Sequence, residues 1–156
     1  MSASEPRVRS LHTYPLKSGR AHTHEAAQIG PMGFQGDRRF MVVDAAGQFV
    51  SQRGYPLLAL VELEVAPDGT GATLLVPGYD PIDVIRGGLV GRRDVMIWGQ
   101  WVPAESIPGH ADRALSAYLG APVNLVHFPA DGERMPDLPY ADLTDRLAYA
   151  DGFPFL

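Results

Sequence analysis

Hydrophobic and polar residues alternate over several short stretches of this chain, and the alternation predicts a protein built mainly from β-strands. From Val61 to Val65, apolar and acidic residues alternate with a period of two, which is typical of a strand with one face in water. The stretch "PDGTG" then predicts a turn, so we interpret residues 59–76 as a hairpin. Further strands are expected over residues 7–14, 80–86, 93–106 and 122–128.

A second hairpin is expected over residues 38–53, "RRFMVVDAAGQFVSQR". Its arms are residues 40–43 and 48–52, and the "DAAG" between them combines an Asp that can begin a turn with a Gly that can adopt positive φ. Within the strand expected at 93–106, Gly99 indicates a bulge or a sharp bend.

One helix is predicted over residues 110–119, "HADRALSAYL", because its apolar residues recur at helical spacing. Gly120 and Pro122 follow it as stop signals. Six or seven short strands with one or two helices predict a mostly-β fold, arranged as a β-barrel-like curled sheet. Closure into a barrel suits many short strands because it leaves fewer strand edges unpaired.

The chain is expected to contain one main domain, over residues 1–128. The segment that follows is polar and contains three prolines before residue 143, so residues 129–148 are interpreted as a loop or linker. The final residues "AYADGFPFL" end as an apolar run begins, whereas natural termini are usually polar. We therefore interpret residues 149–156 as the truncated start of another domain.

Composition narrows the function classes. Lys and Arg total 13 and Asp and Glu total 18, so the formal charge is −5, which argues against a nucleic-acid partner. The sequence contains no cysteine, so no disulfide, thiolate metal site or Cys nucleophile exists within this chain. The first ten residues lack the apolar core of a signal peptide, and no run approaches the ~20 apolar residues of a membrane span. A cytoplasmic protein without a membrane partner is the expectation.

Two short motifs carry candidate binding chemistry. In "YPLKSGR", Lys17 offers a point charge, Ser18 a hydroxyl and Gly19 a backbone that a ligand can approach closely. In "GDRRF", Arg38 can be held by the preceding Asp37 and present a planar fork to phosphate. From the residues alone, a solvated turn is the better interpretation of the first motif. A structural Asp–Arg pair, or two Arg on an exposed strand, is the better interpretation of the second.

The other polar residues give weaker signals. His22 and His24 resemble a short metal clip, but two ligands are too few without a distant third. Trp98 and Trp101 are interpreted as core or rim aromatics of the sheet. The sequence contains neither G-x-S-x-G nor H-E-x-x-H, so an independent hydrolase has no support.

Taken in order, the motifs show a resemblance to a known family. The chain resembles the N-terminal β-barrel domain of MOSC proteins, molybdenum-cofactor oxidoreductases that include the amidoxime-reducing components. The matching pieces cover nearly the whole chain: "YPLKSGR", "EAAQIGPMGFQGDRRFMVVDAAGQFVSQRGYPLLALV", "VMIWGQ", "LGAPVNLV" and "YADGFPFL". Each piece is weak alone, and their order and spacing make the match specific.

The resemblance implies a cofactor and a partner domain. Molybdopterin would lie between this domain and a C-terminal MOSC domain of the same protein, with Lys17, Ser18 and Arg38 contacting it. Arg39 ranks below Arg38, because the family often has an aromatic residue or another Arg there. Gly19 stands where relatives often have a Cys, which is not the Cys expected to hold the metal. That thiolate would lie on the C-terminal domain, so the isolated chain is expected to be inactive.

The implied parent reaction is the reduction of N-oxygenated compounds or a related oxygen-atom transfer, with a small-molecule substrate and an electron-donor protein as partners. The alternative is a free-standing, non-catalytic β-barrel module that binds a small anion or a protein partner. Whether the reading frame continues beyond Leu156 into a domain with a Cys would separate the two hypotheses.

Overall fold

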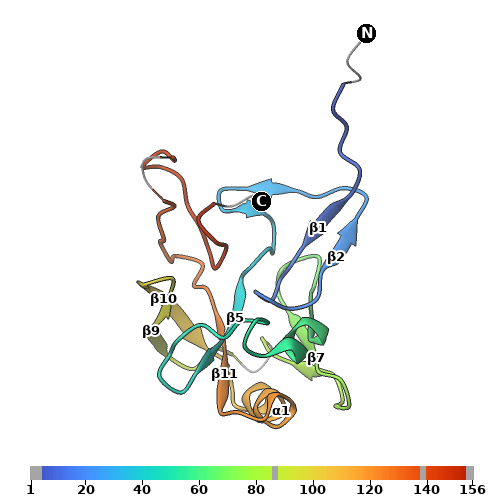
Figure 1. Cartoon of the computed structure of the whole chain (residues 1–156), viewed down its shortest axis with the longest axis vertical. Helices are drawn as coiled ribbons and strands as arrows, with labels where there is room; N and C mark the ends of the chain where they lie inside the picture. Colours follow the sequence, from blue (N-terminus) through green and yellow to red (C-terminus); the bar gives the residue numbers. More distant parts are fainter. Residues whose placement is uncertain (1–4, 86–87, 138–139, 154–156) are drawn as a thin grey trace.

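The computed structural model describes residues 5–85, 88–137 and 140–153 (Figure 1). Short strands dominate this part of the chain, as the alternation predicted. The strands are β1 (Leu11–Thr13), β2 (His22–His24), β3 (Ile29–Gly30), β4 (Gly33–Phe34), β5 (Phe40–Asp44), β6 (Glu62–Val65), β7 (Ala72–Leu75), β8 (Ile82–Asp83), β9 (Arg92–Ile97), β10 (Gln100–Ser106) and β11 (Val123–His127). The helices are the 3-10 helix η1 (Pro56–Leu60) and the α-helix α1 (His110–Leu119). The prediction of a mostly-β fold is therefore confirmed.

The strands form antiparallel sheets. The largest has the order β5-β11-β10-β9, a second has the order β6-β7-β8, and β1-β2 and β3-β4 are two-stranded. Among the described residues these sheets do not close into one continuous barrel. Many of the strands are only two to four residues long, and residues outside them add isolated bridges to the large sheet, such as Leu16 to Phe40.

Several expected elements are found, some with the expected limits and some with altered ones. The hairpin expected over 59–76 is β6 and β7, and the expected helix is α1 with the same bounds. The strand expected over 93–106 is instead the hairpin of β9 and β10. Trp98 and Gly99 make the reversal with φ values of 47° and 79°, so the glycine marks a sharp bend.

The hairpin expected over 38–53 forms only in part. Its first arm is β5, and Gly47 N–H donates to Asp44 O at 3.0 Å in the turn. The second arm makes only isolated bridges, Phe49 with Val43 and Gln48 with Met96, because it passes between two strands instead of pairing fully with either. The strands expected over 7–14 and 80–86 shorten to β1 and β8, and Arg86 lies outside the described residues.

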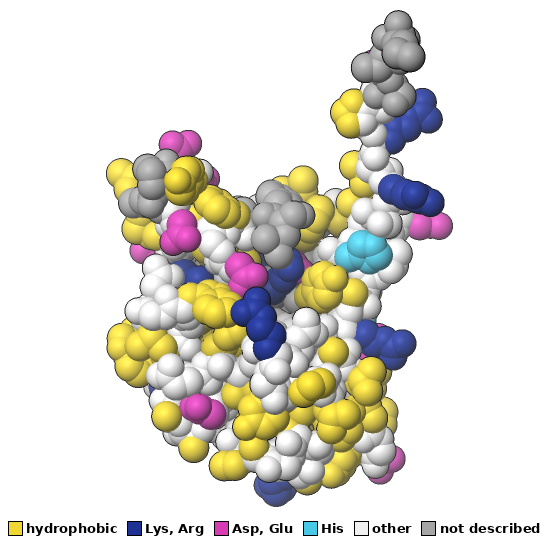
Figure 2. All heavy atoms as spheres, viewed as in Figure 1, with side chains coloured by type: hydrophobic (Ala, Val, Ile, Leu, Met, Phe, Trp, Pro, Cys, Tyr) yellow, Lys and Arg dark blue, Asp and Glu magenta, His cyan; other side chains and the backbone are white. Residues whose placement is uncertain are grey.

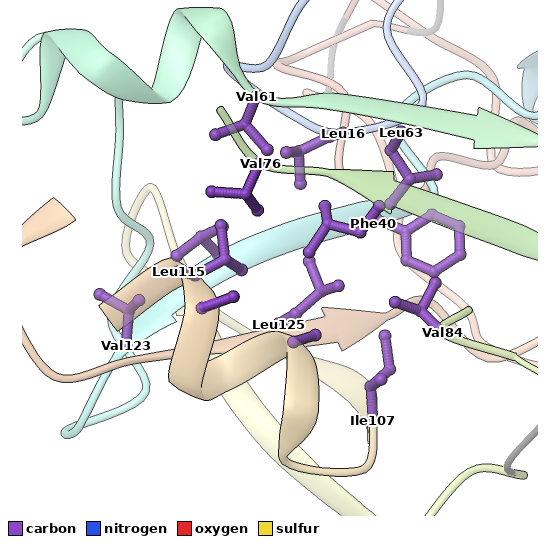
Figure 3. Packing of buried hydrophobic residues seen from close by; sticks show 14 of the residues in the cluster. Leu16, Phe40, Val61, Leu63, Val76, Val84, Ile107, Leu115, Val123 and Leu125 are labelled. Carbon is purple, nitrogen blue, oxygen red and sulfur yellow. The ribbon is translucent and has the colours of Figure 1, made fainter. Parts of the chain in front are cut away.

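The core forms where the two larger sheets face α1. Figure 3 shows side chains from α1, β5, β11 and β6, among them Leu115, Phe40, Leu125 and Leu63, pointing into a common interior. All four are 0–1% exposed, as expected for the apolar face of each element. Gly120, with φ 70°, ends α1 and lets the chain return as β11.

A second core cluster lies on the other face of the large sheet and includes the C-terminal segment. Residues 147–150 are all buried, and the Tyr149 ring packs edge-on against Phe128 with centroids 5.2 Å apart. Residues 129–137 and 140–148 contain no helix or strand. Residues 154–156 of the expected next domain lie outside the described residues, so the predicted domain limits stay predictions.

Neither helix in the described ranges has the length and apolar character that crossing a membrane requires.

Candidate functional site

Backbone hydrogen bonds bring the two candidate motifs together. Lys17 N–H donates to Phe40 O at 2.8 Å, and Arg38 N–H donates to Tyr14 O at 2.8 Å. Leu16 and Phe40 form a parallel bridge between the two segments. Residues 14–17 and 38–40 therefore run side by side, so backbone hydrogen bonds hold the turn of Lys17 against the turn of Arg38 at the start of β5.

A cavity of about 230 Å³ lies where the two motifs meet. Lys17, Ser18 and Arg38, the three site residues expected from the sequence, all line it. The remaining lining residues are Tyr14, Gly19, Phe49, Ser51, Gln52, Arg53, Trp98 and Asp151. Three basic side chains and one acidic side chain thus surround a small space.

Lys17 is buried in this cavity, with only 5% of its surface exposed. Its Nζ lies 2.6 Å from Asp151 Oδ1 and faces the Phe49 and Trp98 rings at 5.0 and 5.9 Å. Burial lowers the pKa of Lys17 from its ordinary value, and the hydrogen bond and charge of Asp151 offset only part of that shift. The ammonium is therefore a poorly hydrated cation that needs an anionic partner.

Arg38 is fixed in place by its neighbours. One terminal nitrogen donates to Asp37 Oδ2, while Asp37 Oδ1 accepts the Tyr14 N–H at 2.6 Å. The guanidinium also lies over the Tyr14 ring, 4.9 Å from its centroid. The two interpretations of "GDRRF" are therefore compatible. Arg38 forms a structural ion pair with Asp37 and also lines the cavity.

Backbone strain concentrates at this cavity. Ser18, Arg38 and Trp98 have φ values of 65°, 46° and 47°, and they are the non-glycine residues with positive φ in the described part of the chain. All three line the cavity. Left-handed backbone is unfavourable for such residues and persists where surrounding structure enforces it, most often at binding sites.

Asp151 and Trp98 are site residues that sequence reasoning did not select. The indole Nε1–H of Trp98 donates to Asp151 Oδ1 at 3.0 Å, so that one oxygen accepts from both Trp98 and Lys17. Partial burial favours a higher pKa for Asp151, but these donors outweigh it and the pKa lies below its ordinary value. Trp98 is 55% exposed, so the interpretation as a core aromatic is wrong and the rim interpretation holds.

Arg134 holds Asp151 in position. Its side chain is buried and donates to the carbonyl oxygens of Ala148 at 2.8 Å, Ala150 at 2.5 Å and Asp151 at 3.3 Å. The only signal in the sequence was a charged residue inside a segment interpreted as a linker. Its partners are these carbonyls and Gln100 Oε1, which accepts from Nε at 3.2 Å, and no residue pattern reveals such contacts.

Other polar candidates lie elsewhere. Arg39 lines a different cavity, together with His22 and His24. No group of three or more His, Cys, Asp or Glu side chains in the described ranges could hold a metal ion. Figure 2 shows basic and acidic side chains next to each other near the centre of one face, with hydrophobic side chains around them.

These contacts define the chemistry available at the small cavity. Lys17, Arg38 and Arg53 supply positive charge, Ser18 supplies a hydroxyl, and Asp151 already holds one of the cations. Charge-assisted hydrogen bonds from such groups bind phosphate and carboxylate oxygens well. The arrangement therefore has the donors to hold an anionic group, and the carboxylate of Asp151 would compete with such a group for Lys17.

Comparisons with known proteins identify the family of the chain. Residues 5–122 match the family described as the MOSC N-terminal beta barrel domain. A curated relative, mitochondrial amidoxime-reducing component 1 of Danio rerio, is 29% identical over 165 residues, which is 96% of this chain and 48% of the relative. This chain thus spans about half the length of that relative.

A solved structure supports the fold alone. The solution structure of a protein from Bordetella bronchiseptica matches with a TM-score of 0.50 and 21% identity, covering 69% of this chain and 92% of that one. The family match covers most of the chain and includes both motifs that meet at the cavity. The chain therefore belongs to the family of the MOSC N-terminal beta barrel domain.

Proposed function

We propose that this chain forms one wall of a molybdenum-cofactor site in a MOSC oxidoreductase. Lys17, Ser18 and Arg38 would hold the phosphate or adjoining pterin groups of molybdopterin. The observation that carries the proposal is the convergence of these three residues, from two separate motifs, on one cavity.

The residues fit an anionic group. Lys17 is desolvated and Arg38 presents a fixed fork, and both properties strengthen bonds to phosphate oxygens. The carboxylate of Asp151 shows that an anionic oxygen can sit within 3.0 Å of both Lys17 and Trp98. The 230 Å³ volume is below the ~300–1,000 Å³ of complete small-molecule pockets, which suits a cavity that holds only part of a ligand.

The chain's own residues would bind and orient the cofactor. The molybdenum centre would supply two-electron oxygen-atom transfer when bound. Lys17 and Arg38 would neutralise the phosphate, and Ser18 would donate its hydroxyl. A C-terminal MOSC domain would complete the site. The reduction of N-oxygenated small molecules, supported by an electron-donor protein, is the parent reaction that the amidoxime-reducing relative supports.

A free-standing module that binds a small anion is the second candidate. The cavity supports it because the cations that line it, Lys17, Arg38 and Arg53, suit small anions in general and not molybdopterin alone. Retention of molybdenum and pterin, rather than anion binding as such, distinguishes the cofactor domain from such a module.

Titration of the chain with methyl phosphate, followed by backbone amide NMR, tests the anion site. We expect shifts at Ser18 and Gly19, and affinity at least about tenfold weaker in Lys17→Gln. Asp151→Asn should tighten binding, because the competing carboxylate is lost. Arg146→Gln, which removes a cation outside the cavity, is the matched control. Binding unchanged in both Lys17→Gln and Asp151→Asn would contradict the site.

A further inference from the structure

Arg38 and Arg39 enter different cavities that share no lining residue. The cavity of Arg39 measures about 530 Å³ and lies between the β1–β2 hairpin, the start of β5 and the turn after β6. Its polar lining residues are Thr13, His22, His24, Gln28, Gln35, Arg39 and His127. The proposed cofactor site uses none of them.

The side chains that line this second cavity carry a net positive charge, although the chain as a whole is acidic. The chain carries a formal charge of −5, yet neither Asp nor Glu is among the lining residues and Arg39 is the one Lys or Arg. Glu62 and Glu105 lie behind the histidines, within 3.7 Å of His22 and 3.1 Å of His127 respectively, and do not line the space.

The guanidinium of Arg39 has N–H donors that are not used in hydrogen bonds to the described residues. Among the described residues, the hydrogen bond of its guanidinium goes to Met32 Sδ at 3.3 Å, and a thioether is a weak acceptor. Burial lowers the pKa of Arg39, which the charge of Asp37 partly offsets, but the guanidinium stays charged at any ordinary pH. Asp37 already accepts hydrogen bonds from Arg38 and Tyr14. A half-buried guanidinium with free donors can bind a further acceptor in the cavity.

The rest of the lining limits what that acceptor can be. Burial lowers the pKa of His127, which keeps its ring neutral at pH 7 and leaves Arg39 as the permanent charge. Apolar walls come from Phe40, Val65 and Ile85. One fixed charge balances a monoanion, whereas a phosphate dianion would bring a second charge into a partly desolvated space without a partner.

We propose that this cavity binds an organic carboxylate with an apolar body of several carbons, its carboxylate on the Arg39 fork and its body against the Phe40 and Val65 side. The volume lies within the ~300–1,000 Å³ range of small-molecule pockets. Guanidinium and carboxylate match in plane and spacing, which favours a bidentate pair.

Titration of the 156-residue chain with octanoate at neutral pH, followed by amide NMR, tests the proposal. Octanamide, the neutral isostere, and inorganic phosphate are the comparison probes. We expect octanoate to shift the Gly36 and His127 amides, and to bind at least about tenfold more tightly than octanamide or phosphate. Absence of octanoate binding at about 10 mM, or equal binding of octanamide or phosphate, would overturn the proposal.

Two variant pairs locate the site. Arg39→Gln should weaken octanoate binding at least about tenfold, whereas Lys17→Gln, in the other cavity, should leave it unchanged. Ala27→Glu places a carboxylate in the lining and should also abolish binding, whereas Ala27→Gln adds similar bulk without charge and should retain it. Octanoate binding that is undiminished in Ala27→Glu would contradict this location of the site, even if Arg39→Gln does not fold.

Discussion

Lys17 and Asp151 are 134 positions apart in the sequence, yet Nζ and Oδ1 lie 2.6 Å apart at the edge of one cavity. The contact makes the C-terminal segment part of the site, because Asp151 is the acidic residue that faces three basic ones. Residues 147–150 are buried next to it, so the position of Asp151 depends on the same core that supports the sheet.

The stability of the chain should depend on pH through Lys17. Its pKa lies below 10.5 in the folded protein, so between the two values the unfolded chain binds a proton that the folded chain has released. The free energy of unfolding therefore rises with pH across that window, and Lys17→Met should lack the rise. Urea denaturation of both proteins at increasing pH measures the difference, about 1.4 kcal/mol per unit of pKa shift. A difference independent of pH up to 10.5 would show that Lys17 is not desolvated.

Arg134→Met should destabilise the chain strongly. The change leaves the carbonyl oxygens of Ala148 and Ala150 without their donor in a buried setting, so we expect a loss of about 2–4 kcal/mol in the free energy of unfolding. Arg146→Met removes an Arg whose nearest carboxylate is 3.7 Å away and should change stability by less than about 0.5 kcal/mol. Equal effects in the two urea titrations would mean that Arg134 does not anchor the segment.

Gly19 should not tolerate a side chain in this fold. A Cβ at this position would lie 2.9 Å from Leu16 Cβ and 3.0 Å from Val61 O, and neither atom belongs to a flexible side-chain end. We expect Gly19→Ala and Gly19→Cys each to lower the free energy of unfolding by about 1–3 kcal/mol. At Gly71 the nearest atom is 3.9 Å away, so Gly71→Ala should be nearly neutral. Thermal and urea unfolding of the variants compare the two positions, and a neutral Gly19→Cys would refute the close packing.

Ser18→Gly should raise the stability of the chain while it weakens methyl phosphate binding. Because Ser18 has a φ of 65°, replacement by glycine relieves an unfavourable backbone conformation and should stabilise the chain by about 0.5–1 kcal/mol. The same change removes the hydroxyl and should weaken methyl phosphate binding. Ser51→Gly alters the same cavity at a residue without positive φ and should not stabilise. Loss of stability in Ser18→Gly would indicate that the serine makes contacts worth more than the strain.

The sequence predicted the fold class and α1 because local patterns determine them. Apolar periodicity set the helix between His110 and Gly120, and the alternation from Val61 to Val65 set β6. The second arm of the 38–53 hairpin could not be predicted, since its partners lie on both β5 and β9. Barrel closure depends in the same way on long-range pairing, which a single sequence does not show.

The sequence predicted the basic and hydroxyl residues of the candidate site but not the residues that face and support them. Lys17, Ser18 and Arg38 lie in short motifs whose residue types reveal their chemistry, and the structure brings all three together. Asp151 and Arg134 depend on tertiary contacts with Lys17 and with backbone carbonyls. Trp98 reaches the site because it lies in a turn and has positive φ. In the sequence, Gly99 indicated a bulge or bend at this place but not the position of the Trp98 side chain.

The most direct test of the cofactor role is the molybdenum and pterin content of this chain expressed together with a C-terminal MOSC domain. The wild type, the double variant Lys17→Gln with Arg38→Gln, and the control Arg146→Gln would be purified and compared after circular dichroism shows that each is folded. We predict at least about a tenfold loss of both molybdenum and pterin in the double variant and none in the control. Full molybdenum and pterin content in a folded double variant would contradict the account.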